Sequence, residues 1–409
     1  MPSLPPPAAV LPAERLLLEL GEALHRFGTP SYRLEQALTA VAARLGIEAQ
    51  VFCVPTSLVI AFGPLGAQRT GLLRLDAGAA DLGKLARLDA VLRRILDGHA
   101  DLDAAIADVR AIVAAPAPLP GAVVLLAAAG SSAAAARFFG GDLPDIAAAA
   151  AIGLVVGVVD RLSERTSAPH LAVPAAAAIG AALATAAPLL LGRLRVELVT
   201  IAGLLALLPG LTFTTGMTEL ATRNFVAGTA RVTMAILTLL ELAFGTALGH
   251  HLVRRVVDGL PRPLSKPAAL PDAVDMGFVA LAGLCLAVIF RARLVDVPVA
   301  VAAAFVGFAG SRLGGLGLGP DLGPFLAALL VAVFANGVAR LTRRPAQVAL
   351  LPGILVLVPG SLGLRSVTGM LEDETLRAID GAFQMGMVAV SLSMGVLVAN
   401  VVVRPRRML

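Results

Sequence analysis

The stretch LLPGLTFTTGMTEL, residues Leu207–Leu220, lies in one of the most apolar parts of the chain, yet it contains a Pro-Gly pair, four threonines and a glutamate. Proline lacks a backbone N–H donor and ends or kinks a helix. Unwound backbone is tolerated within a bilayer only where it is buried in protein or faces a cavity, and there its N–H and C=O groups can bind a polar ligand. The stretch therefore predicts a broken helix beside a cavity.

The composition around this stretch is that of a membrane protein. The 409 residues are 57% hydrophobic and 15% charged, with a mean hydropathy of +0.85, and this is far more apolar than a soluble domain. The apolar residues come in blocks of roughly 17 to 25, the length that crosses about 30 Å of hydrocarbon. We expect about ten spans, near residues 121–138, 144–159, 170–191, 196–215, 229–249, 273–290, 294–312, 322–339, 346–363 and 382–403.

A repeat divides these spans into two halves. GLLALLPG (203–210) resembles GILVLVPG (353–360), and TGMTE (215–219) resembles TGMLE (368–372). Because each half has an odd number of spans, the two halves must enter the membrane from opposite sides. The predicted fold is a polytopic α-helical membrane protein with two inverted five-helix repeats. Gly/Pro-interrupted segments at matching positions of such repeats point to the substrate site.

The amino-terminal part reads differently. Residues 1–118 contain amphipathic helical patterns and short strand-like runs, which predict a small soluble α+β domain. We expect this basic domain in the cytoplasm and the protein in the cytoplasmic (inner) membrane. The membrane part then comprises a first half at 119–252, a basic linker at 253–272 and a second half at 273–409. With five spans before it, the linker is predicted on the outer side of the membrane, against the positive-inside rule. Either it is an exception or the span count is wrong by one.

Polar residues beside the helix breaks form the candidate substrate site. Threonines there either bind a substrate hydroxyl or carboxylate, or bond to carbonyls and neighbouring helices. The breaks themselves could also be kinks that only shape packing. Arg231 either meets a substrate carboxylate, pairs with Glu219 or marks the membrane interface. The expected substrate-binding residues are Pro209, Gly210, Thr212, Thr214, Thr215, Thr218, Arg231, Pro359, Gly360 and Ser361.

Three glutamates are candidates for proton coupling. Glu241 stands alone near the middle of the fifth span, where a charged side chain costs about 2.5 to 3.5 kcal/mol on insertion scales. Glu219 and its repeat partner Glu372 lie near the unwound segments. Such carboxylates can carry a proton or hold an ammonium group. The alternatives are a structural glutamate bonded to a neighbouring helix and acids in interfacial loops.

Several other functions lose support. The chain contains no Walker A lysine motif, no HExxH and no Gly-x-Ser-x-Gly, which are signatures of phosphate-binding loops, zinc proteases and hydrolases. The formal net charge of +5 comes mostly from arginines at helix ends, so we interpret it as a topology signal and expect no nucleic-acid partner. We expect no cofactor, no metal site and no disulfide between Cys53 and Cys285. A homo-oligomer is left open.

The chain also resembles a known family. GEALHRFGTPSYRLEQALTAVAARLGI (21–47), VPTSLVIAFG (54–63), LLPGL (207–211), GTAR (228–231) and LVPGSLG (357–363) are similar to the threonine/serine exporter family. The resemblance covers nearly the whole chain. It implies a soluble amino-terminal domain, sometimes likened to hydrolases, and export of small hydroxy amino acids driven by the proton-motive force.

The leading interpretation is therefore a proton-coupled secondary transporter that exports threonine, serine or a similar small metabolite. Its partners would be this substrate, protons and the lipid bilayer. Three alternatives remain: an exporter of small dicarboxylates such as succinate, a membrane-anchored hydrolase and a passive channel. An anchor needs no second broken helix, so the repeated Pro-Gly pair argues against the hydrolase.

Overall fold

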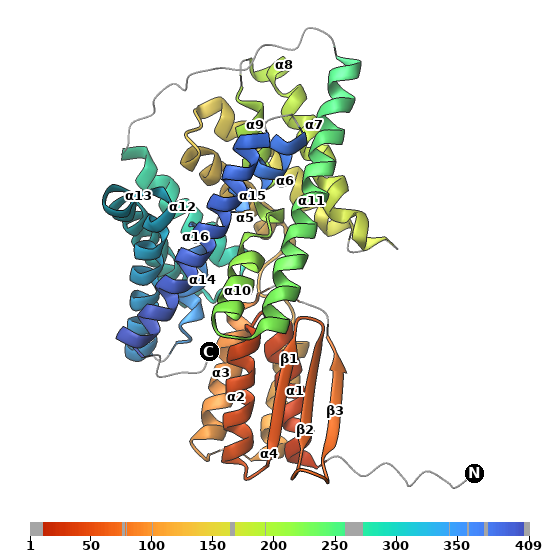
Figure 1. Ribbon diagram of the computed structural model, residues 1–409, viewed down its shortest axis with the longest axis vertical. Coiled ribbons are helices and arrows are strands. Elements are labelled where there is room, and N and C mark those ends of the chain that lie inside the picture. The colour runs from red at the N-terminus through yellow and green to blue at the C-terminus, as the bar shows by residue number, and fades with distance from the viewer. Residues whose placement is uncertain are drawn as a thin grey trace, which may run out of the picture.

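The computed structural model describes residues 11–75, 78, 80–99, 101–163, 168–192, 194–257, 273–342, 344–357, 360–371 and 375–404. Within these residues the chain forms two parts (Figure 1). A helix-and-sheet part lies at one end of the molecule, and a bundle of apolar helices extends from it. We call the end of the bundle that contacts the first part the proximal end, and the opposite end the distal end.

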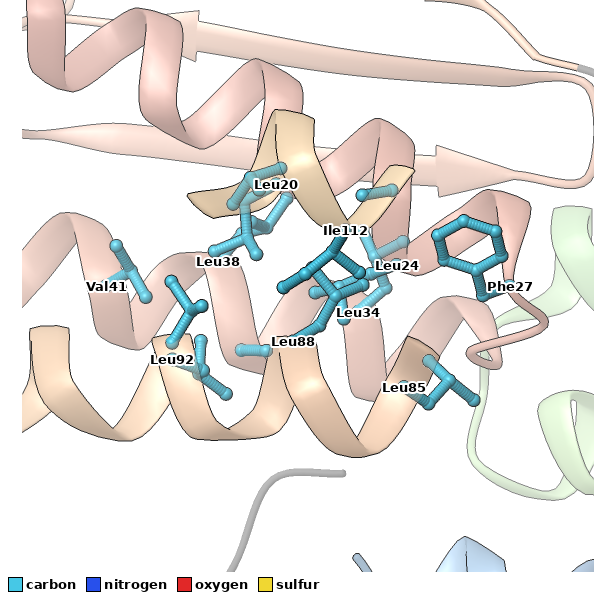
Figure 2. Packing of buried hydrophobic residues seen from close by; sticks show 14 of the residues in the cluster. Leu20, Leu24, Phe27, Leu34, Leu38, Val41, Leu85, Leu88, Leu92 and Ile112 are labelled. Carbon is cyan, nitrogen blue, oxygen red and sulfur yellow. The ribbon is translucent and has the colours of Figure 1, made fainter. Parts of the chain in front are cut away.

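The N-terminal unit, which we define as residues 11–115, combines four helices with a three-stranded antiparallel sheet in the order β1-β2-β3. Apolar side chains of all four helices point toward one another (Figure 2). Leu20, Leu38 and Leu88 are fully buried there, and Leu58 and Ile60 of the central strand join the same core. The elements are α1 (Pro12–Arg26), α2 (Ser31–Arg44), β1 (Ala49–Val54), β2 (Ser57–Phe62), β3 (Arg69–Arg74), α3 (Leu82–Leu96) and α4 (Leu102–Ala114).

The first part of the bundle contains the bent segment with the Pro-Gly pair. Small residues let its helices approach closely: a Cβ added at Gly245 or Gly249 would overlap the carbonyl of Pro174 or Ala178 on the neighbouring helix. The elements are α5 (Gly121–Phe138), α6 (Leu143–Ser163), η1 (Pro169–Leu171), α7 (Ala172–Ala186), α8 (Pro188–Leu191), α9 (Val196–Gly203), η2 (Leu205–Leu207), α10 (Gly210–Ala221) and α11 (Phe225–Val256).

The second part of the bundle follows residues 258–272, which lie outside the described residues and include most of the predicted basic linker. Its elements are α12 (Ala273–Ile289), η3 (Leu294–Asp296), α13 (Val297–Thr342), α14 (Gln347–Leu355), α15 (Gly360–Leu371) and α16 (Thr375–Val402).

α13 is a folded pair of helical arms. Gly319 has a φ of 79° and a ψ of 178°, which interrupts the helix. A Cβ added at Gly310 would lie 2.8 Å from the Cα of Ala327, and one added at Gly314 would overlap Gly323. The arms on either side of Gly319 therefore run back along each other. They correspond to the predicted spans at 294–312 and 322–339.

The helices are long and apolar enough for a multi-pass membrane protein. Among the described residues, seven helices meet the length and hydropathy needed to cross a membrane, or up to eight if the bent pair Val196–Gly203 and Leu205–Ala221 is one span. The bend between the members of this pair is 52°. α12 is a shorter apolar helix. The number ten stays a prediction.

Helices from the two parts of the bundle pack on one another in matching ways. α5 packs on α12, the bent segment ending in α10 packs on α16, and α15 packs on α11. α16 crosses the bundle from the distal end to the proximal end (Figure 1). The two interrupted segments, α9–α10 and α14–α15, therefore lie between the parts.

Candidate functional site

The two broken segments meet at their breaks. Leu208 is extended, with a φ of −65° and a ψ of 125°, as expected for a residue that precedes proline. Pro209 caps α10, and its carbonyl accepts the first helical hydrogen bond from the N–H of Phe213 at 2.9 Å. On the other side α15 begins at Gly360. A Cβ added at Gly360 would lie 3.4 Å from the Cα of Gly210, so the two helix starts are in direct contact.

A cavity of about 270 Å³ lies beside this contact. α5, η2, α10, α12 and α15 all contribute to it, together with Leu355 at the end of α14 and the next residue, Val356. Its polar side chains are Ser131 and Ser361, and it has no charged lining residue among the described ones. The lining residues are Ser131, Ala134, Ala135, Phe138, Phe139, Leu205, Ala206, Leu208, Gly210, Leu211, Ala282, Leu286, Ile289, Phe290, Leu355, Val356, Gly360 and Ser361.

The helix starts give this apolar cavity its polar character. The first amides of an α-helix have no acceptor within the helix, and the helix dipole favours an anionic group at that end. α10 and α15 both present their first residues, Gly210 and Gly360, to the cavity. The arrangement can hold the carboxylate of a small zwitterion without a basic side chain.

A second, charged pocket of about 360 Å³ adjoins the cavity on the distal side and shares Phe138 and Val356 with it. There Asp275 at the start of α12 accepts from Arg137 Nε at 2.7 Å and from Arg312 Nη2 at 3.2 Å. These three charged side chains line the pocket, whereas the cavity has none among its described lining residues.

The four predicted threonines are absent from the cavity lining among the described residues. Thr218 Oγ1 donates to the carbonyl of Thr214 at 2.9 Å and lies 3.0 Å from Ser393 Oγ on α16. Thr214 is buried on the same face, whereas Thr212 and Thr215 are half-buried. Thr214 and Thr218 thus lie between α10 and α16, and their role in substrate binding stays a prediction.

The predicted proton-coupling residue Glu219 lies at the proximal end of α10, away from the cavity lining. Its side chain is 0% exposed. Glu219 Oε2 accepts from Arg231 Nε of α11 at 2.9 Å, so Arg231 takes the pairing alternative. Glu219 Oε1 accepts from the backbone N–H of Ser31, also at 2.9 Å. The carboxylate therefore joins α10, α11 and the first residue of α2.

Residues that the sequence did not single out surround this ion pair. Burial, followed by the charge of Arg231, lowers the pKa of His25. Burial raises the pKa of Glu35, which accepts from the N–H of Cys53 at 2.8 Å, and the charge of Glu219 raises it further. A signal for this site was present: Pro30 offers α2 no side-chain cap, so α2 needed an acceptor from elsewhere.

The remaining predicted residues lie apart. Glu241 is half-buried in the middle of α11, outside the cavity lining, and has no hydrogen bond or ion pair with another described residue. Pro359 and Glu372 lie outside the described residues. Cys53 and Cys285 are both buried and unbonded to each other. The part of the chain that the structure describes holds no group of His, Cys, Asp and Glu side chains suited to a metal ion.

Comparison with known proteins identifies the family. A family model of threonine/serine exporters matches residues 15–253, and a second one described as "Threonine/Serine exporter, ThrE" matches residues 275–402. Two relatives are named "Pheromone-regulated membrane protein 10". The Kluyveromyces lactis protein is 27% identical over 414 residues, covering 96% of this chain and 43% of that protein. The Saccharomyces cerevisiae protein is 26% identical over 429 residues, covering 97% and 55%.

The chain thus spans about half the length of the curated relatives it matches. No solved structure matches it. The two family models together take in both the N-terminal unit and the helices of the bundle. This chain, a multi-pass membrane protein, belongs to the threonine/serine exporter family.

Proposed function

We propose that the protein is a proton-coupled secondary transporter that exports small hydroxy amino acids such as threonine and serine across the cytoplasmic membrane. The observation that carries the proposal is the contact between Gly210 and Gly360 beside a cavity. A membrane anchor has no use for two interrupted helices whose free amides meet at one cavity. A carrier uses such amides to replace the water that a polar substrate loses.

The bundle is proposed to consist of two inverted repeats of five spans. Counting the two arms of α13 singly, and including the bent pair and the shorter helix α12, supports a count of ten spans. The packing of α10 on α16 and of α15 on α11 is what a two-fold relation between the halves produces. Carriers built this way alternate their access by moving one half against the other around a fixed site.

The lining favours an amino acid over a dicarboxylate. A zwitterion has no net charge, and the helix starts can receive its carboxylate while hydroxyls such as Ser131 and carbonyls receive its ammonium group. A dicarboxylate would place two negative charges in a cavity that has no basic residue among its described lining residues, and an unpaired buried charge is strongly unfavourable.

The hydrolase alternative finds little support in the N-terminal unit. Burial raises the pKa of the Cys53 thiol to about 12, so it stays protonated, and the thiolate is the nucleophilic form. We place the N-terminal unit in the cytoplasm and assign it no catalytic role. Proton coupling is proposed for Glu241, with Glu219 and Glu372 as the alternatives.

The experiment is movement of labelled threonine, serine and succinate in vesicles containing the purified protein, with and without an imposed pH gradient. Protein-free vesicles give the background leak. We expect threonine or serine to be concentrated against its gradient only when the pH gradient is present. If only succinate moves, the substrate is a dicarboxylate and not an amino acid. Gradient-independent leakage of all three compounds would identify a channel.

A further inference from the structure

The N-terminal unit holds the first part of the bundle through the start of α2. The N–H of Ser31, the first residue of α2, donates to Glu219 at 2.9 Å. The carboxylate thus lies where the dipole of α2 is positive. Glu219 ends the same short helix, α10, whose first residue Gly210 lines the cavity. A movement of the N-terminal unit at this contact is therefore a movement of one wall of the cavity.

The same unit holds the second part of the bundle through the start of α3. The N–H groups of Leu82 and Gly83 donate to the carbonyls of Phe290 and Arg291 at 2.9 and 3.2 Å. These carbonyls follow the end of α12, so the positive end of α3 meets the negative end of α12. Leu286, Ile289 and Phe290 of this region also line the cavity.

Apolar packing joins the two contacts into one surface. Leu286 and Phe290 belong to the same hydrophobic cluster as the core of the N-terminal unit. Leu211, next to Gly210, packs against this cluster, as do Leu355 and Val356. All five of these residues line the cavity. The apolar lining of the cavity on this side is therefore continuous with the core of the N-terminal unit.

From this geometry we infer that the N-terminal unit is the proximal gate of the transporter: a clamp that binds α10 through Ser31 and α12 through Leu82 and Gly83, and holds the cavity closed toward its own side. The inference rests on the proposed function, because a gate is needed only if the cavity carries a substrate. Opening requires at least one of the two contacts to separate, since α10 and α12 belong to different halves.

Each contact can be broken by a single substitution. Proline is accepted at the first position of a helix, and Pro30 already has the extended ψ of 146° that a following proline needs. Ser31→Pro therefore removes the N–H that binds Glu219, and Ser31→Ala keeps it as the matched control.

At the other contact, a Cβ on Gly83 would lie 2.8 Å from the carbonyl of Arg291, so Gly83→Val separates α3 from α12. Gly277→Val, on an exposed position of α12 with no neighbour within 4 Å, is its control.

The measurement is the rate at which a membrane-impermeant maleimide, added from the proximal side, labels Ser361→Cys in the full chain in vesicles. The protein without Ser361→Cys gives the background from Cys53 and Cys285. We expect Ser31→Pro and Gly83→Val each to raise the proximal labelling rate on the order of tenfold, because Ser31→Pro loses one hydrogen bond to a carboxylate and Gly83→Val weakens two neutral hydrogen bonds. Ser31→Ala and Gly277→Val should label like the parent.

Unchanged proximal labelling in both Ser31→Pro and Gly83→Val would overturn the gate. If one of these variants does not fold, the other still decides, because the two contacts lie on different helices. Labelling needs no substrate, so it is independent of the proposed function. Faster labelling in a protein that moves no amino acid would support the gate and contradict the proposed substrate. Amino-acid transport with unchanged labelling would support the proposed substrate and contradict the gate.

Discussion

Gly210 and Gly360 touch without intervening side chains, and the Cβ missing from Gly360 would also lie 3.1 Å from the Cβ of Leu208. Valine at Gly360 would force the two helix starts apart and into the cavity. Overpacking of this kind typically destabilises by about 1 to 3 kcal/mol. We expect Gly360→Val to reduce threonine efflux at least about tenfold while the protein still inserts. Efflux equal to that of the Gly277→Val control would show that the substrate does not pass through the cavity.

Glu241 tests proton coupling. Glu241→Gln keeps the size and hydrogen-bonding groups of the side chain but removes its titration. We expect pH-gradient-driven accumulation to be lost while exchange without a gradient continues. The comparison is with Glu22→Gln, which changes an exposed residue of α1. If Glu241→Gln still concentrates substrate when driven by pH, the residue is structural and Glu219 with Glu372 become the next candidates.

A substitution at Thr218 distinguishes a role in substrate binding from a role in helix packing. Its hydroxyl lies 3.0 Å from Ser393 Oγ between α10 and α16, and such interhelical bonds contribute about 0.6 kcal/mol on average. We expect Thr218→Val to lower the unfolding temperature slightly and to leave the apparent KM for threonine unchanged. A raised KM at an unchanged unfolding temperature would instead show that the Thr218 side chain binds the substrate.

Asp145 should dominate the stability of the distal end. It is 1% exposed and accepts from Arg195 Nε at 3.0 Å, from Arg195 Nη2 at 2.9 Å and from the backbone N–H of Arg195 at 3.0 Å. Removing one partner of a buried pair typically costs about 3 to 5 kcal/mol, so Asp145→Ala should unfold well below the parent. Glu197→Ala, at a side chain that is 74% exposed in its pair with Arg365, should change stability by at most about 1 kcal/mol. Equal unfolding temperatures for the two variants would contradict the expectation.

His25 makes the stability of the N-terminal unit depend on pH. Burial and the charge of Arg231 lower the pKa of His25 from its ordinary value of 6.5, so the proton binds more readily to the unfolded chain. The stabilisation is then fully present above the unfolded pKa and is lost as the pH falls below it. The unfolding temperature should therefore drop between about pH 7.5 and about pH 5.5, and the drop should shrink in His25→Gln. The control is His251→Gln, at an exposed histidine, and a drop of equal size in both variants would assign the effect elsewhere.

The sequence predicted those features that local chemistry determines. The Pro-Gly pair at Pro209 and Gly210 ends one helix and starts another, because proline acts on its own turn. Two of the strand-like runs, EAQVFCVP (48–55) and SLVIAFG (57–63), contain β1 and β2. The boundary between the predicted spans at 294–312 and 322–339 contains Gly319, where α13 folds back. In each case the signal lies within a few residues of the structure that it produces.

Features that depend on distant partners were not predictable in this way. Helical spacing places Thr214 and Thr218 on one face, but it does not say whether that face meets the cavity or α16. Glu219 was predicted as a proton-coupling candidate near an unwound segment. Spacing along the chain could not show that its partners are Arg231 and a backbone N–H, which carries no sequence signal of its own. Only the uncapped start of α2 after Pro30 pointed to a missing acceptor.

α10 connects the cavity to the N-terminal unit within twelve residues, and this has a thermodynamic consequence. If binding at one end of a rigid element shifts the position of the other, the coupling free energy is the same in both directions. A substrate that settles against Gly210 must then change the hydrogen-exchange protection of α2, and an antibody fragment or ligand on the N-terminal unit must change substrate affinity by the same factor. A ligand of the N-terminal unit can thus act on a site that lies within the bundle of apolar helices.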